Sequence, residues 1–213
     1  MQPNKSKVAL QIGALLLGSS CALTTAADPF NVTVNTIGDV SIATVTALDF
    51  GTNIKTTALG ECVMTAAAPA NTAVFADANV VAGVGVTAFG ALAGTGCVGA
   101  SGTPGIYSVT GEPGLDVTIT LTADAVQAAG DFAFSPTGGC AVIHDNDNAA
   151  TGDLCTALVV GTGLPNVTIA DGVDLATTIN ETHFTVGGTV TVGATALTSD
   201  FDYTATFNVE VTY

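Results

Sequence analysis

The end of the chain alternates strictly between apolar and polar positions. In the segment 201–213, FDYTATFNVEVTY, every odd position is apolar or aromatic and every even position is polar. Successive side chains of a strand point to opposite faces, so this pattern predicts a strand with one face buried. The inward set would be Phe201, Tyr203, Ala205, Phe207, Val209, Val211 and Tyr213. Because chain ends fray unless they are tied down, we expect this strand to be paired or buried along its whole length.

Shorter segments with a strand pattern recur along the chain. Phe30, Val32 and Val34 alternate with polar residues early on, and Val117, Ile119 and Leu121 do so further along. The other strand signals lie in 105–110, 131–140, 156–161, 166–172 and 182–197, the last predicting two strands around Gly187 and Gly188. Turn signals separate the segments and no helical period intervenes. This arrangement predicts an all-β fold, an antiparallel sandwich or barrel, in a single domain.

Composition supports many short strands. The 213 residues are 48% hydrophobic but only 6% aromatic, with 25 glycines and long tracts of Ala, Thr and Val. Thr and Val suit a pleated, half-buried surface, and Gly suits turns. The length is sufficient to bury a core without help from a metal.

Charge is strongly one-sided. The chain has 18 acidic residues against 3 basic ones, and Lys55 is the only basic residue after the first seven positions. Nucleic acid and anionic membrane surfaces are therefore excluded as partners, because both require basic patches. The acidity keeps a Val-rich β protein soluble and discourages pairing between exposed strand edges.

Residues 1–27 have the organisation of an export signal. Lys5 and Lys7 precede the apolar run VALQIGALLLG, and small residues offer cleavage after Ala26 or Ala27. The apolar run is too short to span a bilayer, so we expect a secreted protein with no membrane span in its mature form. Removal of residues 1–27 leaves 3 − 2 = 1 basic residue and a net charge of 1 − 18 = −17. A lipoprotein signal ending at Cys21 is the alternative, although Leu17 lies one place too far upstream.

Four cysteines remain after the signal, Cys62, Cys97, Cys140 and Cys155. An even number in an exported protein predicts disulfides, with three possible pairings. We expect the nearest-neighbour pairing, Cys62 with Cys97 and Cys140 with Cys155. A zinc site is the alternative, but the chain has no CxxC pair and only two histidines.

The segment 144–153, HDNDNAATGD, carries the most suggestive chemistry. Asp145, Asp147 and Asp153 could gather oxygens around Ca²⁺, the one cofactor that the sequence suggests. The alternative is a solvated turn, because Asn and Asp form turns readily. His144 and His183 are the only imidazoles, and no GxSxG nucleophile motif is present. We therefore expect no enzymatic activity.

Two segments carry a resemblance to a known family. LDFGT at 48–52 and the region 184–213, which contains FTVGGTVTVGA and YTATFNVEVTY, resemble a bacterial family of exported β domains of unassigned function. That family is itself similar to spore-coat-U-type proteins and archaic chaperone-usher pilins. The resemblance implies an immunoglobulin-like sandwich over 38–213 that is one strand short. A donor strand from the extension 28–37 of another subunit would complete it.

The resemblance also implies residue roles. Phe30, Val32, Val34 and Ile37 would be the donor side chains, and the terminal strand, through Tyr203, Phe207, Val209, Val211 and Tyr213, would form one wall of the acceptor groove. A head-to-tail contact that does not close gives a filament. The expected function is thus a subunit of a surface fibre, with copies of itself as partners and a periplasmic chaperone and outer-membrane usher as assembly factors. The alternatives are a monomeric surface module that binds calcium or glycan and, third, a hydrolase.

Overall fold

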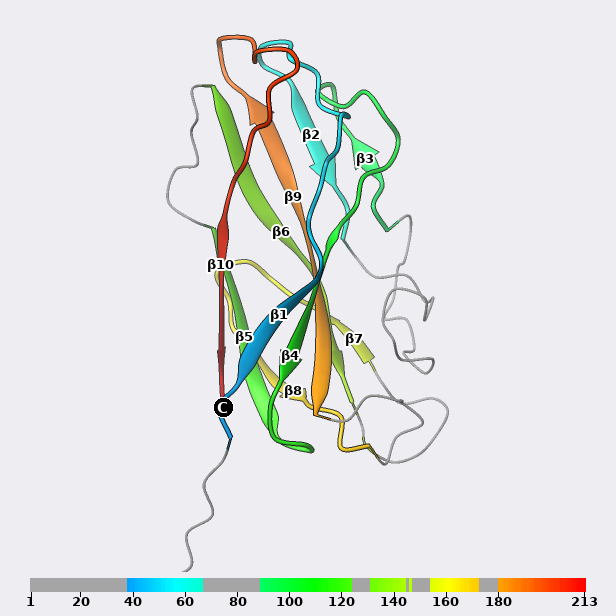
Figure 1. Ribbon diagram of the computed structural model, residues 1–213, viewed down its shortest axis with the longest axis vertical. Helices are drawn as coiled ribbons and strands as arrows, with labels where there is room; N and C mark the ends of the chain where they lie inside the picture. The colour runs from blue at the N-terminus through cyan, green and yellow to red at the C-terminus, as the bar shows by residue number, and fades with distance from the viewer. Residues whose placement is uncertain (1–37, 67–88, 124–130, 145, 147–153, 173–179) are drawn as a thin grey trace, which may run out of the picture. The chain divides into compact units, whose positions relative to one another are not determined.

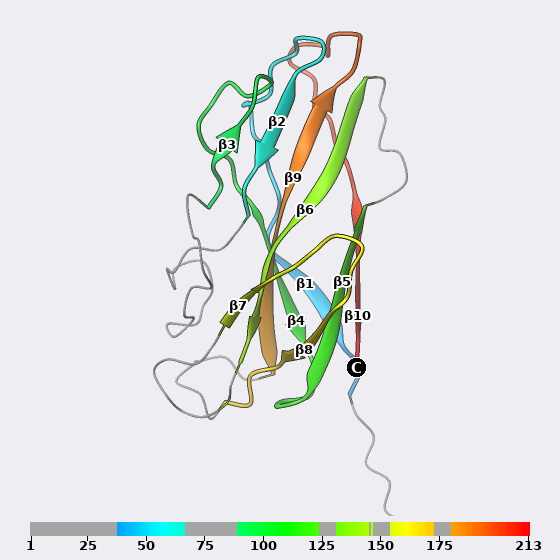
Figure 2. The same cartoon turned by 180° about the vertical axis from the view of Figure 1, so that it is seen from behind.

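The chain folds as an antiparallel β-sandwich. The computed structural model describes residues 38–66, 89–123, 131–144, 146, 154–172 and 180–213, which contain strands and no helix. Residues 37–213 form one compact unit. Within it, a sheet of seven strands packs against a sheet of three, as Figures 1 and 2 show from opposite sides. The predicted all-β fold class is confirmed.

The larger sheet is organised around one long strand, β9. Its members are β1 (Ser41–Thr46), β2 (Glu61–Met64), β3 (Leu92–Ala93), β4 (Gly105–Thr110), β6 (Phe132–Ile143), β7 (Leu154–Ala157) and β9 (Glu181–Val192). On one side β9 pairs first with β4 and then with β2, and on the other side it pairs with β6. Strands β1, β3 and β7 extend this sheet beyond β4, β2 and β6.

The smaller sheet has the order β10–β5–β8, with β5 (Asp116–Ala123) between β8 (Leu164–Thr168) and β10 (Phe207–Thr212). Alternation in β5 places Val117, Ile119 and Leu121 against the core, each at most 1% exposed. They pack with Phe184 and Val186 of β9. Burial of this apolar face, at roughly 25 cal/mol per Å², is the force that joins the two sheets.

The prediction of two strands around Gly187 and Gly188 is wrong, because β9 runs through both glycines without a break. The partner of β9 changes at this point: Val186 pairs with β4, and Gly188 with β2. The ring of Phe134 lies where a side chain on Gly188 would be. The glycines therefore allow close approach within a strand rather than a turn.

The predicted terminal strand is only partly present. Strand β10 begins at Phe207, and no sheet pairing is found for 201–205 in the part of the chain that the structure describes. Phe201 is 60% exposed and Tyr213 46% exposed, so the expectation of a strand paired or buried along its whole length is wrong. The cause is that β10 pairs with β5 only as far as Phe207 with Ala123, where β5 ends.

Both disulfides have the pairing expected from the sequence. Cys62 in β2 is bonded to Cys97, and Cys140 in β6 to Cys155 in β7. The first bond links β2, beside the end of β9 that pairs with β2, to a segment outside the strands, and the second joins β6 and β7 near the end of β9 that pairs with β4. Among the described residues, no helix is long and apolar enough to cross a membrane.

Candidate functional site: an open groove

A cavity of about 830 Å³ lies beside the end of β9 that pairs with β2. Two segments without regular strand structure line it: the connection from β1 to β2 and the connection from β9 to β10. Figure 1 shows the course of both connections. We call this cavity the open groove, its two sides the first wall (47–56) and the second wall (197–205), and its base the floor. The floor residues are Tyr107, Phe132, Phe134, Val190 and Phe207.

The first wall is held by backbone hydrogen bonds to the segment 96–103. Asp49 and Thr103 exchange two N–H···O bonds, each 2.8 Å long. Further along, the Val98 N–H donates to the Asn53 carbonyl at 2.6 Å, and the Lys55 N–H donates to the Gly96 carbonyl at 2.8 Å. The Cys62–Cys97 bond fastens this bracing segment to β2. The first wall is therefore fixed without support from the smaller sheet.

The second wall is held mainly at its beginning. The Leu197 N–H donates to the Thr56 carbonyl at 2.8 Å, a bond that joins the two walls. The Thr198 N–H donates to the Tyr203 hydroxyl at 2.9 Å, closing a short loop in which Asp200 has a φ of 57°. Asp and Asn tolerate this left-handed conformation better than most residues. From Phe201 onward the alternation of the sequence continues, with Tyr203 and Ala205 lining the cavity.

Aromatic rings form most of the floor. The rings of Tyr107 and Phe207 meet edge to face with their centroids 5.7 Å apart, and the ring centroids of Phe132 and Tyr203 are 5.3 Å apart. Phe50 of the first wall and Phe134 of β6 are in edge contact at 6.4 Å. Such pairs lie within the usual range for stabilising aromatic contacts. The groove thus offers an extended apolar base between two backbone walls.

Tyr107 lies at the boundary between the groove and the core. Its ring stacks on Phe184 at 5.3 Å and also lines the groove. Burial raises the pKa of its phenol, while a hydrogen bond with the Leu48 backbone lowers the pKa by a smaller amount. The neutral phenol is therefore favoured at the base of the groove.

Carboxylates stand on both walls. Asp49 on the first wall and Asp200 and Asp202 on the second all line the cavity and are exposed. The Asp49 carboxylate accepts a hydrogen bond of 2.6 Å from the Gly51 N–H, which fixes its position at the turn that follows. An occupant of the groove would pass between negative charges while resting on an apolar floor.

The structure places the residues of the predicted terminal wall in three different settings. Tyr203 and Phe207 line the groove. Val209 and Val211 instead pack against the core between the sheets. Tyr213 lies outside the groove, where its hydroxyl accepts a hydrogen bond of 2.6 Å from the Glu112 N–H.

Other predicted site residues lie outside the described part of the chain. These are the donor residues Phe30, Val32, Val34 and Ile37 and the calcium candidates Asp145, Asp147 and Asp153. Within the described residues, no group of three His, Cys, Asp or Glu side chains could hold a metal ion. Asn146 is described, and its amide is engaged with the backbone of Ile169 and Asp171.

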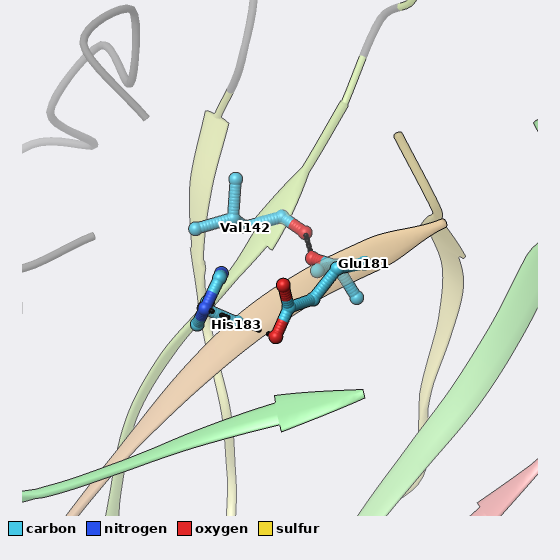
Figure 3. Close-up of polar contacts among 4 residues, drawn as sticks. Val142, Glu181 and His183 are labelled. Atoms are coloured by element: carbon cyan, nitrogen blue, oxygen red, sulfur yellow. Dashed lines mark hydrogen bonds and ion pairs between the residues drawn. The ribbon is translucent and has the colours of Figure 1, made fainter. Parts of the chain in front are cut away.

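Both histidines are buried and neither lines the groove: His183 lies in β9, and His144 directly follows β6. His183 Nε2 lies 3.5 Å from Glu181 Oε1 on the same strand, as Figure 3 shows. The hydroxyl of the intervening Thr182 donates to the Val142 carbonyl at 2.6 Å and so ties β9 to β6. These contacts satisfy polar groups within the sheet.

Of the floor residues, the sequence identified only Phe207, which it assigned to a wall of the groove. Phe132 and Phe134 were recognised only as part of a strand, and Tyr107 was given no role. A usable signal was present in LDFGT, where Leu48 and Phe50 alternate, but only the structure shows which residues face them. No protein-family model, curated protein or solved structure matches the chain.

Proposed function

We propose that the protein is a structural subunit of an extracellular fibre, assembled when a strand from one copy fills the open groove of the next. The observation that carries the proposal is the unfinished second wall. The apolar alternation of β10 extends back to Phe201, yet its sheet pairing stops at Phe207. Among the described residues, the segment 201–205 has a strand's sequence and no strand partner, and it lies beside an apolar floor, so it is suited to β-augmentation.

The extension of another copy has the matching sequence. Phe30, Val32 and Val34 supply alternating apolar side chains for the floor, and the polar residues between them would face outward. The backbone of such a strand could pair with the walls, while its side chains confer specificity. The resemblance to pilin-like exported domains agrees with this role, as does an export signal. No catalytic step is required.

The proposal fixes the geometry of assembly. Each copy carries one extension and one groove, so the contact is head to tail, and a contact of this kind that does not close produces a filament. The subunit would be secreted and would act at the cell surface. A periplasmic chaperone and an outer-membrane usher are the assembly factors that fit such a subunit, since an unpaired strand edge needs cover before assembly.

Electron microscopy of purified protein tests the proposal. We compare the protein of residues 28–213 with a shortened form that lacks residues 28–37. A control of the same length as the first, residues 28–213, has Phe30, Val32 and Val34 replaced by Ser. Only the unaltered protein should form fibres. The shortened form keeps a groove and lacks a donor, so a small amount added to the unaltered protein should cap growing ends and shorten the fibres. Fibres of equal length from all three forms would refute strand donation.

A second candidate function is a monomeric module that binds glycan. One observation favours it: the ring of Phe201 is exposed beside Asp200 and Asp202, which gives an apolar face next to polar groups. Ligand sites commonly combine these features. Glycan binding by the monomer, lost in Phe201→Ala and unaffected by removal of 28–37, would support this alternative over the fibre.

A further inference from the structure

We propose that the carboxylates on the two walls make the open groove selective for an uncharged strand, and that its occupant is the segment 29–38 of a second copy. This inference rests on the proposed function and adds the rule by which the groove accepts one strand and rejects others. Asp49 stands on one wall and Asp200 and Asp202 on the other, so a strand lying between the walls has negative charge on both sides.

The extension fits this requirement. Of the residues 28–37, only Asp28 at the first position is charged, and the uncharged run from Pro29 continues to Gly38, just before Asp39. The positions that would face outward from the groove, beside the wall carboxylates, are Asn31, Thr33 and Asn35. These are polar side chains without charge, in a chain that carries 18 acidic residues.

Two other alternating strands of the same chain do not fit. The strand β5 begins with Asp116, and β10 contains Glu210, so each would bring a carboxylate between the walls. Like charges in close apposition are unfavourable, although exposure to solvent weakens the repulsion. Alternation of apolar residues cannot make this distinction, because both strands alternate as well as the extension does. Charge therefore separates the donor from β5 and β10, which must stay in their own sheet.

Isosteric charge changes in the extension of the exported chain test the inference. The double variant Asn31→Asp/Asn35→Asp adds two negative charges with no change in size, and Asn31→Lys/Asn35→Lys adds two positive ones. We expect the Asp variant to form fibres about tenfold more slowly at low ionic strength, as an order-of-magnitude estimate for several screened contacts. The Lys variant should assemble faster than the unaltered protein. In 1 M salt, where the Debye length is about 3 Å, the three rates should converge.

A matched control distinguishes repulsion inside the groove from repulsion caused by the net charge of the whole protein. Asn166 in β8 and Asn208 in β10 are exposed and do not line the groove. The variant Asn166→Asp/Asn208→Asp has the same net charge as the donor variant and should assemble at nearly the unaltered rate. Asp200→Asn/Asp202→Asn, combined with the Asp donor, should restore most of the lost rate. Asn is suitable at position 200 because it tolerates the left-handed backbone there.

Each outcome has a distinct meaning. Fibres that form at the unaltered rate from the Asp donor variant would overturn charge selection and leave strand donation standing. Equal slowing of the donor variant and the matched control would overturn it too, since general repulsion between subunits would then be the cause. If the unaltered protein forms no fibre under any of these conditions, the proposed function fails and this inference fails with it.

Discussion

The two ends of β9 present the same face to different surroundings. At one end Phe184 and Val186 are covered by the smaller sheet and are fully buried. At the other end Val190, also buried at 3% exposed, lines the open groove with Phe132 and Phe134 of the neighbouring strand, whose rings contact Tyr203 and Phe50 of the walls. The difference arises because β5 and β10 pair only from Phe207 onward. One sandwich thus contains a closed half, completed by its own strands, and an open half over whose apolar face the described residues place wall segments rather than a paired strand.

The largest expected effect distinguishes packing in the two halves. Phe184→Ala should lower the free energy of unfolding by about 3–5 kcal/mol, because it leaves a cavity in the closed half. Phe201→Ala, at an exposed position on the second wall, should change the stability of the monomer by less than about 0.5 kcal/mol. Chemical denaturation of the monomers measures both. A loss of several kcal/mol in the Phe201 variant would show that the open half is packed as a core.

The disulfides provide a second comparison, since one lies beside each half. The chain-entropy model gives about 4 kcal/mol for the Cys62–Cys97 bond and about 3 kcal/mol for Cys140–Cys155, from sequence separations of 35 and 15. We expect paired Cys→Ala substitutions to lower the free energy of unfolding in that order. Only the Cys62/Cys97 variant should also impair fibre formation, because that bond fastens the segment bracing the first wall. Equal impairment by both variants would contradict this role.

Much of the closed half could be predicted from the sequence. Alternation in 115–123 identified β5 and its inward residues, because the two-residue period of a strand depends only on which face is buried. The disulfide pairing was also predicted, because neighbouring cysteines along the chain were the simplest choice. In both cases the determining information is local in sequence.

The open half could not be predicted to the same extent. Alternation in 201–213 correctly identified residues suited to a strand, but it does not reveal whether a partner strand exists at 201–205. At Gly187 and Gly188 the sequence indicated a turn, whereas the structure uses both glycines for close approach in a continuous strand. The groove floor is formed from β4, β6, β9 and β10, and the contacts between strands from distant parts of the sequence are a property of the whole fold.

The smallest expected effect concerns Tyr107, which touches both halves. Burial raises its pKa in the folded state above the unfolded value of about 10. Below pH 10 both states hold the proton, so its contribution to stability is complete. As the pH rises further, the unfolded state releases the proton first, and the free energy of unfolding falls until the pH passes the folded-state pKa. Tyr107→Phe should remove this part of the decline in the free energy of unfolding. Denaturation between pH 9 and 11 measures it, and Tyr213→Phe is the control for the loss of a hydroxyl. An equally steep decline in the Tyr107 variant would show that the base of the groove is open to water, and that the boundary between the two halves lies deeper in the sandwich.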